Sequence, residues 1–417
     1  RHRCPIAYND SNGVLHYFVA AALFNTMTKL TTYTHLFSSS IALSLGSVAA
    51  FQATTSSFNT LSIPQRGGAT TMAIHSTNEA ASSDTTTTSI SSLSSQEILD
   101  QYDTFLLDMW GVMHNGSEPY EGVLEAVKEL KRVGKKMIIL SNSSKRRENS
   151  HKMLAKLGFD INDFDNIITS GDVSHALLQN NAHALGCQNW DTLTTLVEQK
   201  STNVFVFGSG DEDESYCTSA GWTLTSIEEA DLILARGTFT INDGSTVVHK
   251  KDDEMEYWRV MEQSMMVAAE KKLPMLVSNP DKVRPDEGLP PMPGAIGDTY
   301  ERFVWTTHCA PVGDMTEEKA RDYVKRIGKP FQEVFDIALQ DSDPSRAIMI
   351  GDALETDVTG AANAGVGSLW VVQDGIHAED VTKTSAEGVI AGFNGNEFTY
   401  AYGKKVMPNY VTEHFRW

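Results

Sequence analysis

The fold is decided by residues 104–112, which read Thr-Phe-Leu-Leu-Asp-Met-Trp-Gly-Val. A short apolar run that ends in a carboxylate predicts a buried strand with Asp108 at its carboxyl end. A helix follows, with Val123, Val127 and Leu130 at one-face spacing, and residues 136–140 form the next apolar run. Strand, helix and strand at this spacing predict a parallel sheet with helices on its faces.

The same alternation continues on both sides of a long middle part. Further strands are expected at residues 166–169, 347–350 and 368–372, with helices around 153–157 and 355–363. The middle part holds three predicted strands and a long helix of its own, at 203–207, 232–235, 275–277 and 254–271. We therefore expect an α/β protein with a Rossmann-like, doubly wound core and an inserted α/β domain.

Polar residues stand at the ends of the predicted core strands. Asp108, Ser141 and Asp352 each follow such a strand, and Asp357 comes five residues after Asp352. Open parallel sheets bind ligands beyond the carboxyl ends of their strands, so these side chains are expected to converge although they are far apart in sequence. Lys329 lies in a Gly-Lys-Pro segment directly before a helix.

These four segments, in this order, resemble the motifs of the haloacid dehalogenase superfamily. The long insert and the segment Asn279-Pro280-Asp281 are similar to its type IIA phosphatases, and Asp108-x-Trp-Gly-Val resembles a subgroup of that class. The resemblance implies a core of residues 97–172 and 279–417, with an inserted α/β cap domain of the type IIA class at 173–278. Residues 1–96 are expected to be a targeting presequence and a disordered linker.

The resemblance also implies the chemistry and its residues. Asp108 would be the nucleophile that forms an aspartyl-phosphate. Mg²⁺ would be held by Asp108, the backbone carbonyl of Trp110 and Asp352, with Asp357 in support. The phosphate would be bound by three residues, Ser141, Asn142 and Lys329. The substrate would be a small phosphorylated metabolite, for which 2-phosphoglycolate and a nucleotide monophosphate are both candidates.

One position departs from the family pattern. The residue two after the nucleophile is usually an aspartate that serves as general acid and base, and here it is Trp110. Since general acid–base catalysis is worth about 10²- to 10⁴-fold in rate, we keep two hypotheses: a phosphatase, with His114 as a candidate substitute acid, and a binding or regulatory protein of impaired turnover. A carbon–halogen hydrolase would need no metal, and the Asp352–Asp357 pair argues against it.

Three further residues are candidates for contact with the substrate: Asn279 and Asp281 at the end of the insert, and Arg236 at the end of a predicted cap strand. Caps of this class often join subunits, so the resemblance implies a homodimer. The chain carries a net charge of −20, which disfavours nucleic acid as a partner. No apolar run reaches the roughly 18 to 20 residues that span a bilayer, so no membrane partner is expected for the mature form.

The first 96 residues differ in composition from the rest. Their net charge is +1 against −21 for the remainder, and no acidic residue occurs between Met27 and Asn78. An apolar stretch at 36–50 ends in Val-Ala-Ala and is followed by Phe51 and a Ser/Thr-rich tract. This order resembles the bipartite presequence of secondary plastids, with Met27 as the expected start. A plastid location is therefore expected, and a cytoplasmic one is the alternative.

Overall fold

The computed structural model describes residues 87–210, 212–284, 288–309, 314–395 and 406–417. The predicted targeting segment therefore lies outside the described residues. Structure begins before the expected boundary at residue 97, because Thr88 and Ser89 pair with the strand at residues 410–412 and Leu93 is buried. In the described part of the chain no helix combines the length and the apolar character needed to cross a bilayer.

The first sheet is fully parallel and has seven strands in the order β1-β14-β13-β12-β2-β3-β4. Its strands are β1 (Thr88–Ser89), β2 (Thr104–Leu107), β3 (Lys136–Ser141), β4 (Asn166–Thr169), β12 (Ala347–Gly351), β13 (Gly367–Val371) and β14 (Tyr410–Thr412). The central strands β12, β2 and β3 are buried on both faces, which explains their continuous apolar sequences. This sheet is the predicted core.

Side chains of alternating residues pack into two separate clusters on the two faces of this sheet. Phe105 and Leu107 belong to one cluster and Leu106 to the other. One face is covered by α2 (Gln96–Gln101), α3 (Val123–Arg132) and α4 (Arg147–Lys156). The other is covered by α5 (Ser170–Leu178), α11 (Gln332–Leu339) and α12 (Thr359–Ala364). The doubly wound α/β architecture predicted from the sequence is thereby confirmed.

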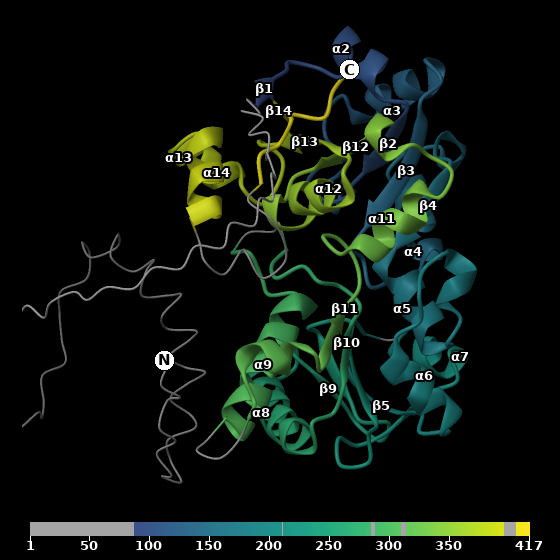
Figure 1. The fold of residues 1–417 in the computed structure, drawn as a ribbon, viewed down its shortest axis with the longest axis vertical. Helices are drawn as coiled ribbons and strands as arrows, with labels where there is room; N and C mark the ends of the chain where they lie inside the picture. Colours follow the sequence, from purple (N-terminus) through teal and green to yellow (C-terminus); the bar gives the residue numbers. More distant parts are fainter. Residues whose placement is uncertain (1–86, 211, 285–287, 310–313, 396–405) are drawn as a thin grey trace, which may run out of the picture. The chain divides into compact units, whose positions relative to one another are not determined.

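The second sheet is mixed and has the order β11-β10-β7-β5-β8-β9, and the short strand β6 also pairs with β5. Its strands are β5 (Asn203–Gly208), β6 (Thr223–Leu224), β7 (Leu232–Ala235), β8 (Thr240–Asn242), β9 (Val247–His249), β10 (Met275–Val277) and β11 (Val324–Arg326). The helices α8 (Glu254–Lys271) and α9 (Pro293–His308) lie side by side against one face (Figure 1). The remaining helices are α6 (Asp191–Glu198), α7 (Asp213–Ser219), α10 (Glu317–Arg321), α13 (Ala378–Lys383) and α14 (Ala386–Gly395).

The second sheet extends beyond the cap boundary expected at residue 278. β11 pairs with β10 through Met275–Val324 and Val277–Arg326, and α9 packs into the same hydrophobic cluster as α8. The helix α9 and the strand β11 therefore belong with the cap rather than with the second half of the core. The sequence pattern did not predict this strand because Val-Lys-Arg contains a single apolar residue. The two charged side chains of the strand form ion pairs with residues of α9 and α11.

Candidate active site

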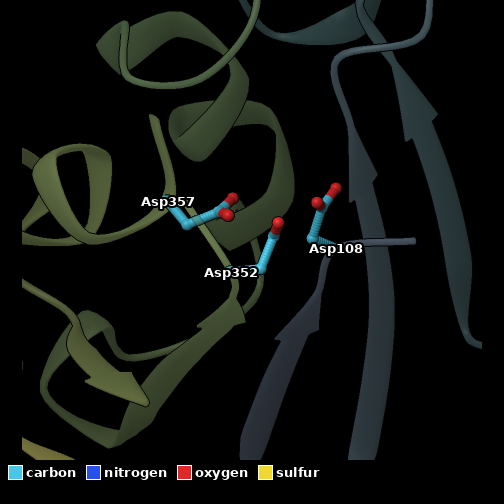
Figure 2. A group of neighbouring side chains, drawn as sticks. All are labelled: Asp108, Asp352 and Asp357. Atoms are coloured by element: carbon cyan, nitrogen blue, oxygen red, sulfur yellow. The ribbon is translucent and has the colours of Figure 1, made fainter. Parts of the chain in front are cut away.

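The site forms where three neighbouring strands of the first sheet end. Asp108 follows β2, Ser141 is the last residue of β3, and Asp352 follows β12. Asp357 comes from a π-helical turn, Leu354–Val358, directly after β12. Figure 2 shows Asp108, Asp352 and Asp357 as neighbours at this edge of the sheet, and one oxygen of each lies within 4.8 Å of the others. The parallel topology thus brings together residues that are nearly 250 positions apart.

Lys329 joins two of these carboxylates. Its Nζ lies 2.7 Å from Oδ1 of Asp108 and 2.7 Å from Oδ1 of Asp357, and only 1% of the residue is exposed. Burial alone would lower the pKa of Lys329, but the two carboxylates outweigh burial and raise the pKa above its usual range. The lysine therefore stays charged, and it fixes the position of the Asp108 carboxylate.

The carboxylates carry more negative charge than the lysine neutralises. Burial raises the pKa of Asp352, and repulsion from Asp357 and Asp108 raises it further. Burial also raises the pKa of Asp357, to about 6, against the opposing effect of Lys329. A buried carboxylate whose pKa is raised is costly to ionise unless a cation joins it.

A hard divalent cation fits this set of ligands. Mg²⁺ prefers oxygen ligands and is usually bound through one or two carboxylates together with water molecules. Close packing holds the Asp352 carboxylate at the site: Gly111 has φ +85°, and a Cβ atom there would lie 2.3 Å from Oδ2 of Asp352. The Asp352 side chain also accepts a hydrogen bond from the Ile376 amide at 2.9 Å. Asp108 and Asp352 are thus the residues that could hold Mg²⁺, with Asp357 beside them.

Ser141 and Asn142 lie beside the lysine. The Ser141 hydroxyl accepts a hydrogen bond from the Ser143 amide at 3.2 Å. The Asn142 side chain accepts from the Lys329 amide at 2.7 Å and donates to the Lys329 carbonyl at 3.0 Å. The Asn142 side chain thus holds the lysine segment, and phosphate binding by Asn142 stays a prediction.

Asn279 and Asp281 close the same corner of the site. Asn142 Nδ2 donates to Oδ1 of Asp281 at 2.7 Å, and the Asp281 amide donates to Oδ1 of Asn279 at 2.9 Å. Burial raises the pKa of Asp281 to about 7, while Asn142 and Lys329 act in the opposite direction. Both residues line the cavity described in the next paragraph. The sequence analysis predicted that they contact the substrate.

The site opens into a cavity of about 370 Å³ that is lined by residues of both sheets. The core contributes Asp108, Trp110, Ser141, Lys329 and Asp352. The cap side includes Ser209, Arg236, Thr238, Phe239, Arg284 and Met292. A volume at the lower end of the usual range for small-molecule sites suits a compact ligand.

His114 lines the cavity, but its surroundings argue against the role of substitute acid that we expected from the sequence. It is fully buried, and its Nδ1 accepts a hydrogen bond from the Gly116 amide at 2.9 Å, which places the proton on Nε2. Burial lowers the pKa of His114 to about 4, so the ring is neutral near pH 7 and has no acidic proton to transfer. Its ring instead packs against Trp110, with centroids 5.8 Å apart.

Arg236 lies in the cavity wall, but a carboxylate already binds its guanidinium. Nη1 donates to Oδ1 of Asp213 at 2.8 Å, the guanidinium carbon lies 3.9 Å from the centroid of the Tyr216 ring, and 1% of the residue is exposed. The same Asp213 accepts hydrogen bonds from the amides of Ser209 and Gly210. Arg236 thus supports the loop after β5, and the structure does not show the contact group for substrate that we expected.

Sequence reasoning missed two residues of the site. Gly111 was noted only as part of a motif, although its left-handed conformation and contact with Asp352 are what require glycine. Arg284 lies in an irregular segment without periodicity, and no sequence signal places it in the cavity.

Comparison with known proteins gives several relatives of partial similarity. A Caenorhabditis elegans protein named for NipSnap is 30% identical over 286 residues, which are 65% of this chain and 48% of that protein. The 4-nitrophenylphosphatase of Schizosaccharomyces pombe is 27% identical and aligns over 68% of this chain and 88% of its own length. Phosphoglycolate phosphatase 2 of Arabidopsis thaliana is 24% identical over 78% of this chain and 94% of its own.

Family models and a solved structure agree with these relatives. A haloacid dehalogenase-like hydrolase model matches residues 105–223, and a second model of the same kind, HAD-hydrolase-like, matches 326–392. A haloacid dehalogenase-like hydrolase from Brucella suis superposes with a TM-score of 0.54 at 21% identity, over 78% of this chain and 99% of that one. The two models support the predicted membership of the haloacid dehalogenase superfamily, the solved structure shows the likeness of the fold, and the names of the relatives support a phosphatase-type enzyme of this superfamily.

Proposed function

We propose that this protein is a Mg²⁺-dependent hydrolase of small phosphate monoesters that works through an aspartyl-phosphate on Asp108. The observation that carries the proposal is the ion-paired cluster at the strand ends, in which Lys329 lies 2.7 Å from both Asp108 and Asp357 beside the buried Asp352. The phosphatase names of the S. pombe and A. thaliana relatives support it.

The chain's own residues account for both chemical steps. An oxygen of Asp108 attacks phosphorus, and the bond from phosphorus to the ester oxygen breaks to release the alcohol. Lys329 stabilises the charge on the phosphoryl oxygens, together with Ser141 and neighbouring amides. Mg²⁺, when bound, supplies charge neutralisation and orients the phosphate. Water then attacks phosphorus, the bond to Asp108 breaks, and inorganic phosphate leaves.

The leaving oxygen must obtain its proton without help from residue 110. The Trp110 indole has no acidic proton, and the buried neutral His114 does not replace it. We therefore propose that solvent water provides this proton, which makes turnover slow for alcohols of high pKa. Esters with acidic alcohols need less protonation of the leaving oxygen and should react faster.

Trp110 also favours a second function, a binding or regulatory protein that retains the site without turnover. The tryptophan is well packed: a Cβ atom on Gly116 would lie 2.8 Å from its ring, and His114 lies beside it. The charged cluster argues for catalysis, because buried charges that do no chemistry reduce stability without benefit. The two functions make opposite predictions in one assay.

The assay is release of inorganic phosphate by the full chain from a panel of phosphometabolites, with Mg²⁺ and with chelator. The panel includes 2-phosphoglycolate, nucleotide monophosphates and 4-nitrophenyl phosphate. Asp108→Asn removes the nucleophile, and Asp103→Asn is the matched control on an exposed carboxylate directly before the same strand. Mg²⁺-dependent release that is lost only in Asp108→Asn supports the hydrolase. Release no greater than that of Asp108→Asn on every ester would favour the binding protein.

Location and assembly are also proposals. We propose that the segment from Met27 directs the protein to a plastid, on the strength of its lack of acidic residues up to Asn78. A fluorescent protein fused behind residues 27–96 and expressed in an alga with secondary plastids tests this, and cytoplasmic fluorescence would contradict it. The proposed homodimer is tested by the mass of the purified chain in solution.

A further inference from the structure

The carboxylate of Asp352 is held by the backbone around it. A Cβ atom on Gly375 would lie 2.1 Å from Oδ2 of Asp352, and one on Gly111 would lie 2.3 Å from the same oxygen. The Ile376 amide donates to this oxygen at 2.9 Å. Because the Asp352 side chain is buried, the orientation of its carboxylate depends on where the backbone of residues 374–376 lies.

Residues 374–376 belong to an irregular segment after β13, and two side chains from distant parts of the sequence hold it. The Tyr120 hydroxyl donates to the Asp374 carbonyl at 2.7 Å. Nδ1 of His414 lies 2.9 Å from Oδ2 and 3.0 Å from Oδ1 of Asp374. An ionised carboxylate can only accept hydrogen bonds, so His414 is the donor. Both side chains therefore hold the residue directly before Gly375.

The segment that carries His414 is itself fixed. Phe415 is fully buried and packs into the hydrophobic cluster on one face of the first sheet. Nε of Arg416 donates at 3.1 Å to the carbonyl of Glu121, the residue directly after Tyr120. The two donors to Asp374 are thus linked to each other as well as to residues 374–376.

Tyr120 suits this role because its hydroxyl keeps its proton. Burial raises the pKa of Tyr120 above its usual range, and the charges of Asp374 and Asp352 raise it further. A metal ligand whose partners already hold it in the binding orientation loses less conformational freedom when the ion binds. Loss of either donor should therefore weaken binding of the ion at Asp352.

We propose that Tyr120 and His414 are positioning residues for Asp352, and that they act through Asp374 on the backbone of residues 374–376. The inference rests on the proposed function, because it takes Mg²⁺ as the ion that Asp352 binds. Neither residue belongs to the sequence motifs that identified the carboxylates, so the proposal extends the site to two further parts of the chain.

The test measures the Kd of Mg²⁺ for the full chain by calorimetric titration with Mg²⁺ alone. Removing a partner of a metal ligand typically weakens metal binding by about 10- to 100-fold, and these residues act one step further from the ion, so we expect Tyr120→Phe and His414→Leu each to raise the Kd about tenfold. The Mg²⁺ concentration for half-maximal phosphate release should rise by the same factor. KM for the ester at saturating Mg²⁺ should stay close to the wild-type value.

Two variants serve as matched controls. Tyr410→Phe also removes one tyrosine hydroxyl, but this hydroxyl donates to Glu97 and Gln101 on α2 rather than to residues 374–376, so the Kd should not change. His414→Asn keeps a donor near the position of Nδ1 and should bring the Kd back toward the wild-type value. If His414→Leu does not fold, Tyr120→Phe alone decides, because it lacks only one hydroxyl.

The outcomes separate this inference from the function beneath it. A Kd in Tyr120→Phe and His414→Leu equal to that of Tyr410→Phe overturns the positioning role, even where the free energy of unfolding has fallen. A wild type that binds Mg²⁺ but releases no phosphate from any ester overturns the proposed function, while weaker Mg²⁺ binding by the two variants still supports the positioning role. A wild type that does not bind Mg²⁺ overturns both.

Discussion

Replacing Lys329 by methionine tests the central electrostatic argument. Each of its two ion pairs joins Nζ to a carboxylate oxygen at 2.7 Å. At an effective dielectric constant of about 20, one such pair is worth about 6 kcal/mol before the cost of removing the lysine from water is subtracted. Removing one partner of a buried pair typically costs about 3–5 kcal/mol, since the other charge is left without compensation. We expect Lys329→Met to lose at least that much free energy of unfolding.

The measurement is urea unfolding of the full chain in chelator, compared with Lys325→Met. Lys325 is the matched control because it forms one ion pair, with Glu333, and both side chains are about 30% exposed. Pairs of that kind are worth about 0–1 kcal/mol. Activity of Lys329→Met should fall by about 10²- to 10³-fold, the usual effect of deleting one group that stabilises transition-state charge.

The pH dependence gives a second readout of the same variant. In the wild type the pKa of Asp357 is raised from 3.8 to about 6, and removal of the lysine must raise this pKa further. A carboxyl whose pKa is higher in the folded than in the unfolded state loses stability as the pH rises through the folded value. Lys329→Met should therefore lose stability between pH 5 and 8 more steeply than the wild type. A parallel pH profile, with a cost no larger than that of Lys325→Met, would refute the reasoning.

Three further predictions concern the site and the packing around it. Gly111→Ala places a Cβ 2.3 Å from Oδ2 of Asp352 and should abolish phosphate release, whereas Gly134→Ala, with a similar φ and no neighbour within 4 Å, should cost only about 1–2 kcal/mol in thermal unfolding. Mg²⁺ at 100 times its Kd should raise the free energy of unfolding by about 2.7 kcal/mol. If Mg²⁺ raised the melting temperature of the wild type and of Asp352→Asn by the same amount relative to chelator, that result would contradict the role of Asp352 as a ligand. Burial lowers the pKa of His175 to about 4, so the wild type should lose up to about 3 kcal/mol relative to His175→Gln as the pH falls from 6.5 to 4. Unfolding curves of the two proteins that stay parallel over this range would contradict that value.

The core and the strand-end residues could be predicted because local pattern and topology agree there. The runs at 104–107, 136–141 and 347–351 are short and mostly apolar, and each either ends in a polar residue, Ser141, or is followed directly by one, Asp108 or Asp352. Once such runs are assigned to adjacent parallel strands, geometry alone brings Asp108 and Asp352 together. Predicting where these two residues lie required no knowledge of side-chain packing.

The errors occurred where a residue's role depends on partners that are distant in sequence. His114 was a reasonable acid by residue type, but the Gly116 amide and complete burial keep its ring neutral. Arg236 carries the charge that an anionic substrate would need, but Asp213 already binds the Arg236 guanidinium. The strand at 324–326 escaped notice because β10, rather than an apolar pattern, determines its conformation. In each case the deciding contact is tertiary, and periodicity contains no information about it.

The order of strands in the first sheet has a consequence for synthesis of the chain. β2 lies between β3, which follows it closely, and β12, which is made more than 230 residues later, after the whole cap. At a translation rate of about 5–20 residues per second, one edge of β2 stays unpaired for roughly 10–50 seconds on the ribosome. An unpaired edge of a strand that carries apolar side chains such as Phe105 and Leu107 is a template for pairing with other chains. The nascent chain is therefore expected to need protection by a chaperone until β12 emerges, and slowing translation within the cap should increase aggregation.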